Sequence, residues 1–517
     1  MKGRNKILIL VLSILSLIGC TDYLDKQPLD KISSSTFWKT KSDFNMALTA
    51  IYGLNTSGAS WDNPPGGVWA YHLPNWDNIT DNSYGQHNYF NSKSIVAGDI
   101  TSSTGGYVSI VYSLSYQAIA RVNIYLRELS GYNGTDMTDA DKKVAEAEVK
   151  FFRAYYYFQL YCAYGDVPLV TEPLTLENQE QAKVSSDKVY AQIISDLDAA
   201  IANLKTVPYY QNSGHVTKST AQALKARVLI YQAYGSNGTP DSGILSQVKS
   251  LCQEIIPQYE LSPVFENVFQ DKGQAGNKEI IYSVNYLAPD NVPAYGSDLI
   301  YGDWIMVSPL QSFVDAFECS DGLAWGVSPL TDTANPFNNR DPRLNKTVFV
   351  DHPDWGGGNV HLPTNGRPTG YGLKKFLCPE NTPYGYTTLS QQDAVIFRLG
   401  EVLLMYAEAQ NEIAGPDASV YQAMTDLRAR VGMPPYPAGL SKEQMRERIR
   451  HERRIELAFE GLRYFDLKRW HIAGTVLNNV KDGKLTYKWD DKFYHWPLPQ
   501  EEIDKNHGVL VQNPDYK

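Results

Sequence analysis

Long segments in which apolar residues recur every three to four positions constrain the fold of this chain more than any other feature. Within residues 138–164, the apolar side chains that share one helical face are Val144, Phe151, Tyr155, Phe158 and Cys162. Thr138 is typical of a helix N-cap, and Gly165 is typical of the residue that ends a helix. The same criteria predict helices over 217–234, 394–414, 417–430 and 441–462. The chain is therefore predicted to be mainly α-helical.

Short turns join several of these helices into pairs. Gly415 and Pro416 end one predicted helix directly before the next begins at Asp417. Such pairs, rich in Ala, Tyr and Leu, are typical of tetratricopeptide repeats, although the period of about 34 residues is not regular here. We predict degenerate tetratricopeptide-like helical hairpins with long irregular loop insertions. The irregular stretches, where a site is expected, are 59–100, 289–304 and 330–389.

The N-terminus has the pattern of an export signal. Three basic residues among the first six precede an apolar run over 7–18, which is too short to cross about 30 Å of hydrocarbon as a helix. The residues Leu17-Ile18-Gly19-Cys20 resemble the lipobox of bacterial lipoproteins. In those proteins the cysteine becomes the lipidated first residue of the mature chain. We therefore predict a lipoprotein signal peptide over 1–19 and a lipid anchor at Cys20.

Composition excludes several classes of protein. The 47 Lys and Arg residues are outnumbered by 57 Asp and Glu residues, which argues against nucleic-acid binding because that function needs a basic surface. The fractions of hydrophobic (43%) and charged (20%) residues are ordinary, so the chain is not disordered. Cys162 and Cys252 fall in helical patterns and are expected to be buried thiols. With Cys319 and Cys378 they show no zinc-site spacing, and the disulfide state is left open.

Catalytic motifs are missing from the sequence. There is no P-loop, no GxGxxG after a strand and no GxSxG elbow. His451-Glu452 begins like a zinc-protease motif, but Ile455 stands where the second histidine is required. We therefore do not expect an enzyme, and neither a zinc-site spacing nor an EF-hand loop indicates a metal site. A glycosidase pair of carboxylates stays open as an alternative, since carboxylates are plentiful.

One irregular segment is rich in aromatic residues that alternate with short polar ones. Residues 59–90 contain seven aromatics among many Asn, Asp and Gln side chains. Flat rings stack on the apolar faces of sugars, and the polar side chains hydrogen-bond to sugar hydroxyls. The candidate ligand-binding residues of this segment are Trp61, Trp69, Tyr71, Trp76, Asn78, Asp81, Asn82 and Tyr84. A second aromatic group, whose loops could fold against the first, is Tyr295, Tyr301, Trp304 and Trp325.

Both the aromatic residues and the charged segment 451–470 also have a structural explanation, in which they stabilise the fold and contact no ligand or substrate. The aromatic residues could instead fasten a long loop to the helices, which predicts buried tryptophans. In the segment 451–470, Glu452 lies on an apolar helix face, and a charge in such a place is usually paired. We predict a buried ion pair between Glu452, or Glu456, and an arginine.

Taken together, the motifs resemble the SusD/RagB family of outer-membrane nutrient-binding lipoproteins from Bacteroidetes. The segments that carry the resemblance are the lipobox with Tyr23-Leu24-Asp25, and residues 151–170, 220–231, 397–412, 427–434, 451–470 and 496–516. They extend over residues 20–516 and so cover essentially the whole mature chain. The resemblance implies one SusD-like domain over 20–517, with an N-terminal helical-repeat half to about 235 and a C-terminal half from about 236.

The resemblance also implies a function. Family members are lipid-anchored in the outer membrane, at the cell surface, and pair with a SusC-like TonB-dependent transporter. They capture an oligosaccharide, or less often a peptide, and close over the transporter as a lid. They are not enzymes and need no cofactor. Their ligand sites use aromatics from an N-terminal and a mid-chain loop, here the regions 61–84 and 295–325. The identity of the glycan and of the transporter is left open.

Overall fold

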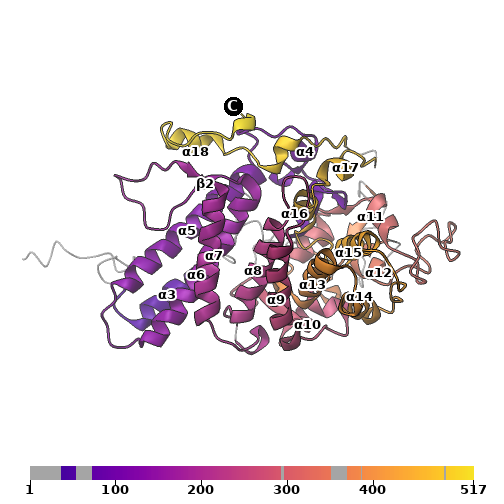
Figure 1. The fold of residues 1–517 in the computed structure, drawn as a ribbon, viewed down its shortest axis with the longest axis horizontal. Helices are drawn as coiled ribbons and strands as arrows, with labels where there is room; N and C mark the ends of the chain where they lie inside the picture. The colour runs from indigo at the N-terminus through magenta and orange to yellow at the C-terminus, as the bar shows by residue number, and fades with distance from the viewer. Residues whose placement is uncertain are drawn as a thin grey trace, which may run out of the picture.

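Long helices lie side by side across the molecule, and the C-terminal segment runs along one edge of them (Figure 1). In this computed structural model the described residues are 37–53, 73–212, 214–292, 296–350, 369–382, 384–385, 387–481 and 485–516. Their long helices are α3 (Lys41–Tyr52), α5 (Tyr107–Ser130), α6 (Asp139–Tyr164), α7 (Ser186–Asn203), α8 (Lys218–Gln232), α9 (Ser242–Ile255), α13 (Leu399–Ala414), α14 (Ala418–Arg430) and α15 (Lys442–Glu456).

From α3 to α14 each long helix packs against the next long helix, and α15 packs on α13. Helix α6 packs on both α5 and α7, α9 packs on both α8 and α13, and α13 packs on both α14 and α15. This succession of helix-on-helix contacts confirms the predicted tetratricopeptide-like, mainly α-helical architecture.

Short elements lie in the connections between the long helices. The short α-helices are α4 (Ser92–Val96), α10 (Asp271–Gln274), α11 (Gln311–Ala316), α12 (Arg343–Thr347), α16 (Arg463–Arg469), α17 (Ala473–Leu477) and α18 (Gln500–Lys505). The 3-10 helices are η2 (Leu73–Ile79), η3 (Tyr89–Asn91), η4 (Tyr209–Gln211), η5 (Ile256–Gln258), η6 (Phe265–Val268), η8 (Pro379–Asn381), η9 (Asp491–Tyr494) and η10 (Pro514–Tyr516). The element η7 (Asp298–Asp303) is a short π-helix. Antiparallel pairs join β1 (Ser83–Tyr84) to β5 (Ser308–Pro309), β2 (Val167–Pro168) to β3 (Lys183–Val184), β4 (Ile280–Val284) to β8 (Ala394–Arg398), and β6 (Val348–Phe349) to β7 (Gly372–Leu373).

Side-chain caps fix where the helices begin. The Thr138 hydroxyl accepts a hydrogen bond from the backbone N–H of Asp141 (3.1 Å), and the Asp141 carboxylate accepts one from the backbone N–H of Thr138 (3.0 Å). Ser441 and Gln444 make the same reciprocal pair at the start of α15. These contacts satisfy backbone donors that a helix leaves free in its first turn, so the predicted starts at Thr138 and Ser441 are confirmed.

Two predicted helices are shorter than the periodicity suggested. The first five residues of the segment 394–414 form strand β8, which pairs with β4 in the register Ile280 to Arg398. The helix predicted to reach residue 462 ends at Glu456, because Phe459 and Gly461 have φ angles of 63° and 77°. A Cβ on Gly461 would lie 2.9 Å from Leu73, so the turn depends on glycine for close approach as well as for its conformation.

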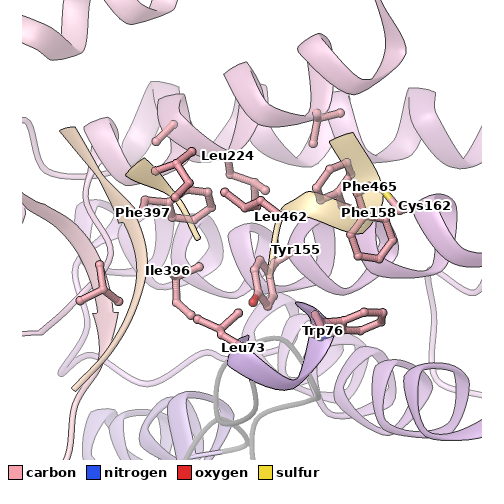
Figure 2. Close-up of a cluster of buried hydrophobic side chains, with 14 of the residues drawn as sticks. Leu73, Trp76, Tyr155, Phe158, Cys162, Leu224, Ile396, Phe397, Leu462 and Phe465 are labelled. Atoms are coloured by element: carbon pink, nitrogen blue, oxygen red, sulfur yellow. The ribbon is translucent and has the colours of Figure 1, made fainter. Parts of the chain in front are cut away.

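The core joins elements that are far apart in the sequence. Figure 2 shows Tyr155 and Phe158 of α6 together with Leu224 of α8 and Phe397 of β8. All four cysteines of the described residues are buried free thiols, as predicted for Cys162 and Cys252. Burial raises the pKa of the Cys378 thiol to about 12.

Charged side chains form a network within this core, as the sequence predicted for Glu452 and Glu456. Glu452 accepts hydrogen bonds from Arg343 (2.5 Å) and Arg428 (3.0 Å). Glu456 accepts them from Arg343 (3.0 Å), Arg398 (2.7 Å) and Arg430. Burial alone would raise the pKa of Glu456, but the three guanidinium groups hold it well below its usual range. The predicted buried ion pair is confirmed, and it forms part of a larger network of charged side chains.

Candidate functional site

The two aromatic segments of the sequence meet in the structure. Strand β1 pairs with β5, with Ser83 opposite Pro309 and Tyr84 opposite Ser308. The Asn78 amide donates to the carbonyl of Met306 (3.0 Å), and His87 Nε2 lies 3.2 Å from the carbonyl oxygen of Trp304. The prediction that loops of the second group could fold against the first therefore holds for the loop that carries Tyr301 and Trp304. We call the surface around Tyr84, His87 and Trp304 the aromatic face.

Rings on the aromatic face are partly open to solvent. Tyr84, Tyr89 and Trp304 are half-buried, and His87 is exposed. The Lys93 ammonium lies 5.2 Å from the centroid of the Tyr84 ring, so one side of that ring carries a cation. Half-buried rings next to a cation and an imidazole belong to the side-chain types that stack on a ligand and hydrogen-bond to it.

Trp304 directly follows the π-helix η7, whose first residue is buried. The backbone N–H of Trp304 donates to the carbonyl of Leu299 (2.9 Å). Asp298, at the start of η7, is fully buried and accepts hydrogen bonds from a distant segment. Its donors are the backbone N–H of Cys378 (2.8 Å), Asn381 Nδ2 (2.8 Å), Ser390 Oγ (2.9 Å) and Gln392 Nε2 (3.2 Å). Burial raises the pKa of Asp298, while these donors act in the opposite direction.

Trp76 and Tyr301, two of the candidate stacking residues, lie in the core instead. Trp76 is 0% exposed, and its ring stacks on Tyr107 at a centroid distance of 4.2 Å. Tyr301 is 2% exposed. Figure 2 shows Trp76 directed into the apolar cluster with Phe465. Neither ring presents a face to solvent, so in this structure both stabilise the fold, as the competing structural explanation anticipated for Trp76.

The polar candidates Asn78, Asp81 and Asn82 are also directed inward. Asp81 forms a two-point ion pair with Arg463 (both distances 2.9 Å) and a further pair with Arg454 (3.0 Å). Burial would raise the pKa of Asp81, but the two arginines hold it well below its usual range. Asn82 accepts from Arg454 (2.8 Å). These contacts attach the segment before β1 to α15 and α16, in place of the predicted contacts with ligand.

Trp325 packs against an arginine. It is half-buried, and the Arg340 guanidinium lies 4.2 Å from its ring centroid. Arg340 also donates to the carbonyls of Val314 (2.6 Å) and Phe317 (2.9 Å), so it is fixed to the end of α11. The remaining candidates, Trp61, Trp69, Tyr71 and Tyr295, and the predicted lipid anchor Cys20, lie outside the described residues.

A polar cavity that the sequence did not indicate lies where α3 ends. It has a volume of about 370 Å³, and its lining residues include Tyr52, Gly53, His215, Asn285 and Asn291. In the sequence, the segment with Trp61 follows Gly53 and the segment with Tyr295 follows Asn291. The lining comes from separate parts of the chain with no shared motif, so no sequence pattern could have indicated it.

Glu148 organises one wall of this cavity. Its carboxylate accepts a hydrogen bond from the Tyr52 hydroxyl (2.6 Å) and lies 2.9 Å from His215 Nδ1. The Tyr52 hydroxyl in turn accepts from the backbone N–H of Val216 (2.9 Å). The hydrogen bond to Glu148 raises the pKa of His215, although partial burial opposes this.

The stability of the protein should therefore depend on His215 in a pH-dependent way. A folded-state pKa above the ordinary value of about 6.5 means that the contribution is present below pH 6.5 and is lost as the pH rises through the folded value. His215→Ala is expected to lower the melting temperature by about 1–2 °C at pH 5.5 and by less at pH 8.5. Thermal unfolding at both pH values measures this. In a Glu148→Gln background the difference should disappear, and equal effects at both pH values would contradict the assignment.

Comparison with known proteins gives the family. The model of the SusD family matches residues 263–516, and a model described as "Starch-binding associating with outer membrane" matches residues 22–230. The chain belongs to the SusD family. Proteins of this family bind carbohydrate, and the second description associates them with the outer membrane. None of the helices in the described ranges is both long and apolar enough to span a bilayer.

Individual SusD-like proteins are similar over nearly their whole length. "SusD-like protein P25" of Formosa agariphila is 26% identical, and the alignment covers 99% of this chain and 98% of that protein. A SusD-like protein of Bacteroides fragilis has a crystal structure that is 26% identical, with a TM-score of 0.77, covering 95% of this chain and all of that one. Surface glycan-binding protein A of Bacteroides thetaiotaomicron, solved with laminarihexaose, shares the fold at 22% identity and a TM-score of 0.70, covering 92% of this chain and 99% of that one.

Proposed function

We propose that this SusD-family protein is a lipid-anchored, cell-surface binding protein that captures oligosaccharides and acts as the lid of a SusC-like TonB-dependent transporter. It binds its ligand and does not cleave it. The support for glycan as the ligand class is the aromatic face, where the pairing of β1 with β5 joins the segments that carry Tyr84 and Trp304. Family membership supports the association with the outer membrane, and the lipobox before Cys20 supports the anchor.

The aromatic face fits weak, reversible capture. Its rings are half-buried, so a sugar would stack on an open surface and keep part of its hydration. A few stacking contacts and exposed hydrogen bonds correspond to dissociation constants in the micromolar to millimolar range, about −4 to −8 kcal/mol. Such affinity suits a protein that must pass its ligand on. Closure over a transporter further requires that the ligand bind the closed state better than the open one.

Removing the Trp304 ring tests the proposal. The protein without residues 1–20 is assayed by affinity gel electrophoresis and calorimetry against a polysaccharide panel that includes starch and laminarin. Trp304→Ala is expected to weaken binding to the recognised polymer by roughly tenfold, because the loss of one stacking ring costs about 1 kcal/mol or more. Tyr84→Ala should act in the same direction.

Two controls separate a lost contact from a damaged fold. Trp304→Phe keeps a ring at the same place and should retain most of the affinity, and Tyr210→Ala, a half-buried tyrosine on η4, should bind as the unchanged protein does. Undiminished binding by Trp304→Ala would place the ligand elsewhere. Binding of peptides and of no polymer would replace the glycan in the proposal with a peptide.

A further inference from the structure

A second cavity, away from the aromatic face, lies where the ends of α6, α8 and α16 meet. Its volume is about 660 Å³, within the range of about 300–1,000 Å³ that is usual for small-molecule sites. Tyr161 and Cys162 of α6, Tyr231 of α8 and Lys468 of α16 contribute to its lining. Figure 2 shows Cys162 close to Phe465, which also lines the cavity.

Lys468 is the unusual residue of this cavity. It is 7% exposed, and its ammonium donates to the carbonyl of Cys162 (2.7 Å) at the C-terminal end of α6. Among the residues that the structure describes, no carboxylate forms a salt bridge with it. Lys375, the other strongly buried lysine, donates to the Glu460 carboxylate at 2.6 Å. Buried charges in proteins are normally paired, and Lys468 departs from that rule at the wall of a cavity.

The charge of Lys468 is not neutralised by its neighbours. Arg469, which also lines the cavity, is itself cationic and pairs with Glu408 (Nη2–Oε2 2.8 Å) and with Asp466 (2.8 Å), which it shares with Arg453. Burial lowers the pKa of Lys468 to about 8, which leaves most of the side chain protonated at neutral pH. Asp491 also lines the cavity, on its exposed side near His471 and Tyr494, and among the described residues it forms no salt bridge with Lys468. The buried wall therefore carries an ammonium without a carboxylate partner, while an acid stands at the opening, where it can accept hydrogen bonds from hydroxyls.

The rest of the lining combines rings with polar groups at the opening. Tyr494 stacks on His471 at a centroid distance of 4.4 Å, and both are half-buried. Ser236 and Asn237 are exposed on the loop after α8 and offer a hydroxyl and an amide. Rings on the walls suit the apolar side of a small cyclic molecule, and the polar opening suits its hydroxyls.

We propose that this cavity binds a hexuronic acid residue, with the sugar carboxylate on the Lys468 ammonium and the sugar ring against Tyr494. A sugar carboxylate supplies the anionic partner that Lys468 lacks, and it accepts the remaining hydrogen bonds of the ammonium. The hydroxyls of the sugar reach Ser236 and Asn237. The site is separate from the aromatic face, so it would give the protein a second contact, selective for acidic units of a glycan.

Titration with single sugars tests the site directly. Glucuronate and galacturonate are titrated into the protein without residues 1–20, with calorimetry and ligand-observed NMR as readouts, and glucose, benzoate and phosphate serve as comparison ligands. We expect millimolar binding of a uronate, and binding at least tenfold weaker for glucose, which lacks the charge. Benzoate binding as tight as the uronate would overturn the sugar assignment, and phosphate binding as tight would show a general anion site.

Variants locate the binding. Lys468→Met keeps the length of the side chain and should reduce uronate affinity at least tenfold, since a charged hydrogen bond is lost. Tyr494→Ala, at the opening, is a second variant with less risk to the fold, and it should reduce affinity severalfold. Lys188→Met, on the exposed side of α7, is the matched control and should bind uronate unchanged.

The outcome does not depend on the aromatic face. Trp304→Ala should bind uronate normally even where it loses the polysaccharide, so failure of one site is distinguishable from failure of the other. Unchanged uronate affinity in folded Lys468→Met and Tyr494→Ala proteins, or no uronate binding by the unaltered protein at millimolar concentration, would overturn the proposal.

Discussion

Glu456→Ala is expected to lower the free energy of unfolding by about 3–5 kcal/mol, because it removes from a buried network the anion that three arginines share. Glu456 is fully buried and accepts from Arg343, Arg398 and Arg430. Among the described residues, Arg430 then retains one anionic partner, Glu279 (3.0 Å). Since domains are stable by about 5–15 kcal/mol, the loss is a large fraction of the total. Chemical denaturation of the protein without residues 1–20 measures it.

The matched control is Glu447→Ala on the same helix. Glu447 is 70% exposed in its side chain, and within the described ranges its one ion pair is with Arg450, at 3.3 Å. An exposed ion pair contributes little, so this change should cost less than about 1 kcal/mol. Comparable losses from the two variants would show that the network does not stabilise the fold as its geometry indicates.

Trp76→Ala should be destabilising by about 3–5 kcal/mol, the range for deletion of a large buried ring. The indole stacks on Tyr107 at 4.2 Å and lies parallel to Trp496 at 6.0 Å, with no solvent on either side. The decisive measurement is the denaturation midpoint, compared with the glycan affinity of whatever fraction remains folded. We expect the midpoint to fall and the affinity of the folded fraction to stay the same.

Trp76→Phe provides the control, since it keeps an aromatic ring and should recover part of the stability. If Trp76→Ala instead kept the midpoint and lost glycan binding, Trp76 would be a ligand contact and the burial seen here would belong to another state. The denaturation midpoint must be measured together with the affinity, because an unfolded protein also loses binding and would otherwise be mistaken for a protein with an altered site.

Local patterns gave the helices well, and their limits explain the errors. Thr138 and Ser441 each cap a helix through a partner three residues later. Both members of the interaction are therefore visible in a short stretch of sequence. The spacing of Ile396, Leu399 and Leu403 fits a helix, yet residues 394–398 pair with β4 from more than a hundred residues earlier. Tertiary pairing of this kind overrides a local period and cannot be deduced from it.

The candidate site was predicted less completely, for a related reason. Asn78, Asp81 and Asn82 have the composition of an exposed loop, but their partners are Met306, Arg463 and Arg454, which only the fold brings near. Composition identifies polar side chains and does not reveal whether the protein or the solvent satisfies them. The meeting of the two aromatic groups was anticipated, whereas the division into core rings and surface rings required the structure.

The attachment of residues 77–82 to the C-terminal helices sets the order in which the aromatic face can form. The backbone N–H of Phe459 donates to Asp77 (2.8 Å), and Arg463 pairs with Asp81. The segment before β1 can therefore reach its final position only when residues nearly four hundred positions later are present. A chain is synthesised from its N-terminus, and contacts this distant close last. A growing chain therefore passes through most of its length before the aromatic face can be complete, and completion of this face depends on the docking of α15 and α16.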